Sequence, residues 1–161
     1  EEPTFWEFKD NLEPGKTYSV IVKTVSGKVT SWPVTADVTL KPLGVENLVS
    51  EYDESSGAIS ISWTPNPTST QESYLVSYHE VESTIGDSNT IPTNKSKITL
   101  EALLPGRNYS VTVEAVSKDQ LSVENMIYVA TKPSAPIIED LKPIIDGLNI
   151  SWKSDVNSKQ D

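Results

Sequence analysis

The chain has 161 residues, of which 36% are apolar and 22% charged, and its formal net charge is −10. This size suits one domain or slightly more, no apolar run is long enough to cross a bilayer, and the charge argues against nucleic acid and heparin as partners. With no cysteine and His79 as its one histidine, the chain lacks the residues for thiolate chemistry or a cysteine zinc site, so we expect no enzyme.

The first part of the chain predicts short strands near Trp6–Phe8, Thr17–Val25 and Ala36–Leu40. The opening Glu1-Glu2-Pro3 is acidic where a secretory leader is basic and then apolar. We therefore expect the sequence to be an excerpt of a longer chain.

The middle of the chain alternates apolar and polar residues with a period of two, which is typical of strands with one buried face. The apolar members of three such runs are Ile59, Ile61 and Trp63; Tyr74, Val76 and Tyr78; and Tyr109, Val111, Val113 and Ala115. Turn residues separate the runs, and no stretch carries a helical stripe. A further strand is predicted near Leu148–Trp152.

Two motifs recur along the chain. The run Leu12–Val20 returns 91 residues later as Leu103–Val111, and the two similar strands that end in Trp63 and Trp152 place these tryptophans 89 residues apart. These periods predict one complete module at 43–132, preceded at 1–42 by the end of a module and followed at 133–161 by the beginning of another. A half module cannot cover its core face, so either residues are missing or fragments pair between chains.

The strand ending in Trp63, the Tyr-x-Val-x-Tyr strand, the Leu-x-Pro-Gly-x-x-Tyr corner and the proline at each junction together resemble the fibronectin type III repeat. The resemblance implies an all-β fold of tandem immunoglobulin-like sandwiches, with about seven strands in two sheets per module. It also implies tyrosine corners at Tyr18 and Tyr109. We expect these two tyrosines to be structural core residues, together with Trp63, Tyr74, Tyr78 and Trp152. No catalytic, metal-binding or cofactor-binding residue is predicted.

A narrower resemblance lies in the run Thr24–Val34 and the segment Val38–Leu43 that follows it. These residues are similar to the ectodomain of an insect neuronal receptor-type tyrosine-protein phosphatase. The resemblance implies a segment on the extracellular side of a single-pass membrane protein, with a role in ligand binding, adhesion or spacing in signalling such as axon guidance. The phosphatase domain itself is not in this chain. Its implied partner is a protein ligand or cell-surface protein of unknown identity, and lateral self-association is a further option.

Two alternatives stay open for the same modules. One is an adhesion or extracellular-matrix protein, and the other is an intracellular structural array, which predicts unused glycosylation sequons. An Arg-Gly-Asp motif, which would support integrin binding, is absent.

Three Asn-x-Ser sequons are N-glycosylation candidates, at Asn94, Asn108 and Asn149. If Tyr109 and Ile150 face the core, strand parity turns Asn108 and Asn149 outward, where a glycan disturbs no packing. Asn94 lies in a polar stretch that is typical of a loop.

Parity also places His79 on the outer face of its strand, where we interpret it as a solvated residue. The acidic run Glu51–Glu54 lacks the spacing of a calcium loop and is interpreted as a solvated loop. Trp32 follows a polar turn and precedes Pro33, so it is either an edge staple, which we favour, or an exposed contact. Short junctions that contain Pro42 and Pro133 predict a semi-rigid rod.

Overall fold

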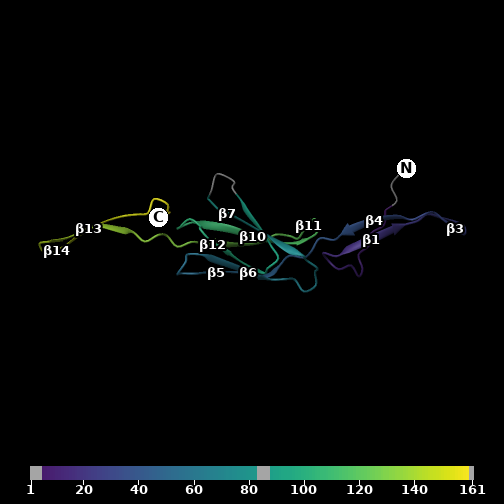
Figure 1. Ribbon diagram of the computed structural model, residues 1–161, viewed down its shortest axis with the longest axis horizontal. Coiled ribbons are helices and arrows are strands. Elements are labelled where there is room, and N and C mark those ends of the chain that lie inside the picture. Colours follow the sequence, from purple (N-terminus) through teal and green to yellow (C-terminus); the bar gives the residue numbers. More distant parts are fainter. Residues whose placement is uncertain (1–4, 83–87, 160–161) are drawn as a thin grey trace.

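The computed structural model describes residues 5–82 and 88–159, and these residues form an elongated, all-β molecule that contains no helix (Figure 1). A two-layer sandwich occupies the middle of the molecule. A pair of strands with a small hairpin lies at one end, and a second hairpin lies at the other end. The all-β fold class is therefore as the sequence predicts.

The sandwich consists of two antiparallel sheets. The smaller sheet has the order β5-β6-β9, with strands β5 (Glu46–Tyr52), β6 (Ile59–Thr64) and β9 (Lys97–Leu100). The larger sheet has the order β11-β10-β7-β8, with β12 also paired to β10; its strands are β7 (Ser73–Glu80), β8 (Asn89–Thr93), β10 (Asn108–Ser117), β11 (Gln120–Leu121) and β12 (Asn125–Ala130). All eight strands lie inside the predicted module 43–132, whose exact bounds stay a prediction.

The core lies between these two sheets and follows the predicted alternation. Ile59, Ile61 and Trp63 of β6 are buried, whereas Ser60 and Ser62 between them are only half-buried. From the larger sheet, the fully buried side chains are Val76, Val111 and Val113. The inward-facing side chains of the two sheets, at every second position of each strand, therefore form the core together.

The N-terminal end consists of β1 (Thr17–Val22) paired with β4 (Val34–Thr39), and of the two-residue strands β2 (Val25–Ser26) and β3 (Val29–Thr30). No strand forms near Trp6–Phe8, so that prediction is wrong. Within the sandwich the equivalent strand β9 pairs with β6, and the described N-terminal residues include no counterpart of β6 that could complete such a ladder.

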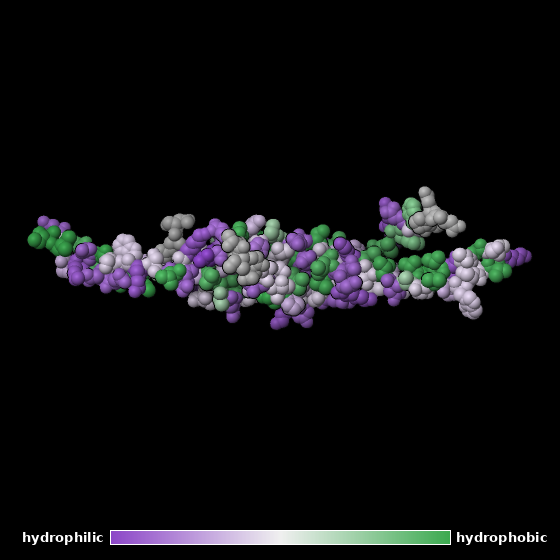
Figure 2. Space-filling model, turned by 90° about the horizontal axis from the view of Figure 1, so that it is seen from above, coloured by the Kyte–Doolittle hydropathy of each residue, from purple (hydrophilic) through white to green (hydrophobic). Residues whose placement is uncertain are grey.

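The C-terminal end is a hairpin of β13 (Ile137–Ile144) and β14 (Gly147–Lys153), with a register shift between Ile138 and Asp140. Its strands are exposed along their whole length. Figure 2 shows hydrophobic side chains gathered at both ends of the molecule, where each strand pair has no second sheet packed on it among the described residues. Whether residues 1–42 and 133–161 are stable alone stays a prediction.

Candidate functional site

The predicted core aromatics differ in how deeply the structure buries them. Trp63 and Tyr74 are 5% exposed, and their rings meet edge to face with centroids 5.2 Å apart. Tyr109 is 7% exposed, whereas Tyr78 is half-buried against the same core. An edge-to-face pair at this distance adds to the stabilisation that comes from burying both rings.

Both expected tyrosine corners have the required hydrogen bond. The Tyr109 hydroxyl oxygen accepts a hydrogen bond from the Leu104 amide at 2.9 Å, and the Tyr18 hydroxyl oxygen accepts one from the Glu13 amide at 2.8 Å. Burial raises the pKa of Tyr109, because ionisation would place a negative charge in a low-dielectric environment. Tyr18 is half-buried, since β1 and β4 present its ring to no second sheet among the described residues.

Two tryptophans are more exposed than the sequence predicts. Trp152 on β14 is 62% exposed, because the β13–β14 hairpin has no opposing sheet within the described part of the chain. Trp32 is 92% exposed between β3 and β4, so the favoured edge-staple interpretation is wrong, and its role as an exposed contact stays a prediction. Local alternation indicates which side a residue faces, but burial also requires a neighbouring layer.

The three sequon asparagines are all exposed. Asn94 lies in the turn between β8 and β9, Asn108 begins β10, and Asn149 lies within β14. Their amides are therefore accessible to a glycosyltransferase, and the use of each sequon stays a prediction.

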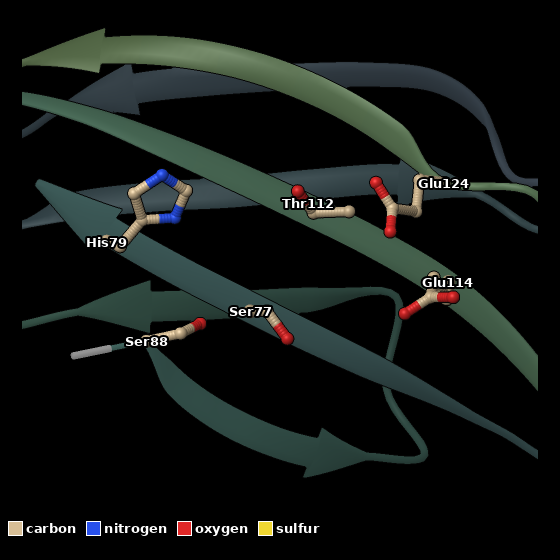
Figure 3. A pocket seen from close by; sticks show the side chains of 6 residues that line it. All are labelled: Ser77, His79, Ser88, Thr112, Glu114 and Glu124. Carbon is tan, nitrogen blue, oxygen red and sulfur yellow. The ribbon is translucent and has the colours of Figure 1, made fainter. Parts of the chain in front are cut away.

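A shallow hollow of about 450 Å³ lies on the outer face of the larger sheet (Figure 3). Polar side chains from β7, from β10 and from the segments that lead into β8 and β12 line it: Ser77, His79, Ser88, Thr112, Glu114 and Glu124. In Figure 3, His79 lies at one end of this face, whereas Glu114 and Glu124 lie together at the other. We call these six residues the outer-face hollow.

The electrostatics of the hollow are set by its acidic end. Burial raises the pKa of Glu114, and the negative charge of Glu124 raises it further. A cationic side chain of a partner, placed beside Glu114, would offset this effect on its carboxylate. The sequence alone does not reveal this pair, because the two residues are ten positions apart and are brought together by the β10–β12 pairing.

Beside the hollow, strand β12 adds exposed apolar surface. Met126 is 52% exposed opposite Thr112, and Tyr128 is 67% exposed opposite Ser110. Ser110 itself is 3% exposed although it points to the outer face, because it lies between His79 on β7 and Tyr128 on β12. An exposed mixture of apolar and charged groups on a rigid sheet is suited to contact with another protein.

His79 and the acidic run are the other residues singled out by the sequence. His79 is exposed, and among residues 5–82 and 88–159 no three histidine, aspartate or glutamate side chains are grouped so that they could hold a metal ion. In the acidic run, the Asp53 carboxylate accepts hydrogen bonds from the hydroxyls of Ser56 and Ser55, each at 2.7 Å. These bonds lower the pKa of Asp53 to about 2, so this carboxylate organises its own turn.

Comparison with known proteins identifies the fold. The family model described as a fibronectin type III domain matches residues 43–125, which is more than half of the chain. Human tenascin-R is 25% identical over 131 residues, covering 78% of this chain and 9% of that protein. The chain thus spans about a tenth of that relative's length.

Solved structures agree with the family match. A two-domain fibronectin type III segment of chicken tenascin superposes with a TM-score of 0.57 and 24% identity, covering 71% of this chain and 65% of that one. The FN1–FN3 domains of chicken CNTN1 superpose with a TM-score of 0.53 and 19% identity, covering 78% of this chain and 46% of that one. In the described residues, no helix is long and apolar enough to span a membrane.

Proposed function

Because this chain belongs to the fibronectin type III family, we propose that it is a non-catalytic segment of an extracellular adhesion or matrix protein, in which it contacts another protein and spaces its neighbours. The observation that carries the proposal is the similarity to tenascin-R across 78% of the chain, which extends well beyond the single matched module. The exposed aromatic, methionine and glutamate side chains of the larger sheet supply a surface for such contact.

The contact surface that we propose is the acidic end of the outer-face hollow together with Met126. A partner with a lysine or arginine next to an apolar side chain would relieve the repulsion between Glu114 and Glu124 and would cover Met126. The net charge of −10 favours the approach of a basic partner. A glycan on Asn108 would cover the opposite end of the same face, where His79 lies, and would leave the acidic end accessible.

A cell-attachment assay tests this surface. Cells are plated on the immobilised 161-residue chain and on a double variant, Glu124→Gln with Met126→Ser, which alters only exposed side chains. The matched control makes a comparable pair of changes on the outer face of the smaller sheet, Glu51→Gln with Val49→Ser, where both side chains are also exposed.

The proposal expects attachment to fall on the double variant and to stay unchanged on the control. Equal attachment to both variants would assign the contact to another part of the chain. Absence of attachment to the unaltered chain would leave spacing as the remaining role.

The extracellular placement is tested separately by mass. The chain is secreted from insect cells, and its intact mass is compared before and after enzymatic removal of N-linked glycans. We expect a loss of one or more glycan masses that disappears when Asn94, Asn108 and Asn149 are all changed to Gln. A secreted chain without glycan loss, or a chain that fails to be secreted, would favour the intracellular structural array.

A second candidate is the ectodomain of a receptor-type tyrosine phosphatase, which is favoured by the run Thr24–Val34. This candidate would place the segment on the extracellular side of a single-pass membrane protein, in signalling such as axon guidance. Sequencing the parent transcript distinguishes the two candidates. A membrane span followed by a phosphatase domain supports the receptor, whereas further modules without a span support the matrix or adhesion protein.

A further inference from the structure

The two junctions between modules have the same hydrogen-bond pattern, although several of the residues at equivalent positions differ. At the first junction the Thr70 amide donates to the Pro14 carbonyl at 2.9 Å, and at the second the Lys159 amide donates to the Pro105 carbonyl at 3.3 Å. Pro14 and Pro105 are 91 residues apart, and Thr70 and Lys159 are 89 apart, which are the two repeat periods of the sequence. The contact therefore recurs with the modules.

A second bond repeats in the same way. The Leu43 amide donates to the Ser69 hydroxyl at 2.8 Å, and the Ser134 amide donates to the Ser158 hydroxyl at 2.9 Å. Each donor directly follows the junction proline, and each serine lies six residues after a tryptophan, Trp63 or Trp152. The loop after β6, or after its counterpart β14, is thus tied both to the junction and to the preceding corner.

Glycine at the corner is what allows this approach. Gly15 and Gly106 have φ values of +77° and +68°, and a Cβ on either would overlap a backbone carbonyl oxygen of the incoming loop, that of Thr70 or of Lys159. A clash with backbone cannot be relieved by rotating a side chain. These two glycines therefore combine a left-handed conformation with direct contact between modules.

Side chains reinforce each junction with different chemistry. At the first, the Ser117 hydroxyl donates to the Gly15 carbonyl at 2.5 Å, and the Thr70 hydroxyl donates to the Glu13 carboxylate at 2.6 Å. At the second, Lys159 forms an ion pair with Glu82. The loop-to-corner backbone bond and the amide-to-serine bond are common to both junctions, whereas these further side-chain contacts differ between them.

We infer that the Pro-Gly corner of each module is a docking surface for the loop that follows the core tryptophan strand of the next module, and that this docking holds neighbouring modules in one fixed orientation. The kind of partner that fits is a loop with serine six residues after its tryptophan and a free backbone amide at the seventh position. The junction contacts involve no residue of the outer-face hollow, so this docking does not depend on whether the hollow binds a partner.

Amide hydrogen exchange of the full chain, measured by NMR, tests the docking. Thr70 and Lys159 are exposed loop residues whose amides donate only across a junction in the described structure, so their protection reports on docking. We expect Gly15→Ala to reduce protection at Thr70 by about tenfold or more while Lys159 is unchanged, and Gly106→Ala to have the reverse effect.

Each junction is thus the control for the other, and Gly27→Ala is a third control. Gly27 has a φ of +59° but no atom within 4 Å of its Cβ position, so this variant carries the backbone strain without the clash. The Val111 amide in the core strand reports whether each variant is folded. If Gly15→Ala does not fold, Ser117→Ala removes the bond to Gly15 without a backbone clash and should reduce protection at Thr70 by a smaller factor.

Three results would overturn the inference: unprotected amides at Thr70 and Lys159 in the unaltered chain, retained protection at Thr70 in both the Gly15→Ala and Ser117→Ala variants, or an equal effect of Gly27→Ala. Residual dipolar couplings test the fixed orientation in the same samples. Amides of β1 and β10 should fit a single alignment tensor, and a need for two tensors of different magnitude would contradict a fixed orientation.

Discussion

Replacing Tyr109 by phenylalanine deletes one oxygen atom and tests how far the tyrosine corner stabilises the sandwich. The hydroxyl oxygen accepts the Leu104 amide at 2.9 Å in a partly buried position, while the ring is 7% exposed. Phenylalanine keeps the ring but leaves the Leu104 amide without its acceptor. An unsatisfied, partly buried backbone donor costs about 1–3 kcal/mol, so we expect the free energy of unfolding to fall by that amount.

Urea denaturation followed by tryptophan fluorescence measures the effect. Trp63 is the one buried tryptophan of the four, since Trp6, Trp32 and Trp152 are 62% or more exposed, so its emission reports on the sandwich. The matched control is Tyr128→Phe, which deletes the same atom from an exposed ring of the same sheet.

The slope of the unfolding free energy against urea concentration should be the same in both variants. The urea concentration at the midpoint of unfolding should fall only for Tyr109→Phe. A loss below about 0.5 kcal/mol, or an equal loss in the control, would refute the reasoning that the corner bond is a significant source of stability.

Three further variants test other parts of the structure by the same urea assay. Ile61→Ala, at a side chain that is 0% exposed, should lower the free energy of unfolding by about 2–5 kcal/mol through lost burial and a cavity, and a loss under about 1 kcal/mol would contradict its core position. The hydroxyls of Ser56 and Ser55 lower the pKa of Asp53 to about 2, so the stability that its carboxylate contributes is lost as pH falls from about 4 to about 2. In Asp53→Asn the free energy of unfolding should therefore decline less over that range. An unchanged decline would be evidence against these hydrogen bonds. Burial, and then the charge of Glu124, raise the pKa of Glu114, so the folded state binds the proton more tightly and gains stability as pH falls through that pKa. Glu114→Gln should therefore be more stable than the unaltered chain at pH 7, with the difference vanishing below about pH 4. No gain at pH 7 would argue against a cost of burying this carboxylate beside Glu124.

The fold could be predicted because its signals are local. The alternation through Ile59, Ile61 and Trp63 indicates both a strand and its buried face, and the repeat periods indicate where the same strand recurs at Trp152. Burial of Trp152 did not follow, because burial depends on a second sheet and not on the strand itself. The exposure of Trp32 was not predicted for a related reason, because the sequence of a short hairpin does not reveal which neighbours its flanking residues will contact.

The candidate site and the docking surface could be predicted only in part. The outward direction of Asn108 follows from the parity of Tyr109, but the meeting of Glu114 with Glu124 requires the register between β10 and β12. The contact of Gly15 with Thr70 depends on how two modules are placed, which no periodicity specifies. The repeated Pro-Gly pair was visible in the sequence, whereas its role toward the next module was not.

The junction is asymmetric, because each module has a corner that receives a loop at one end and a loop that docks at the other. In residues 43–132 the corner contains Gly106 and the docking loop contains Ser69 and Thr70. An in-frame duplication of a whole module would therefore carry both halves of a compatible joint with it. Such an array can lengthen or shorten by gene duplication or loss without new complementary mutations, because every new boundary reproduces an existing head-to-tail contact. The length of the array would then be free to vary in evolution while the angle at each joint stays constant.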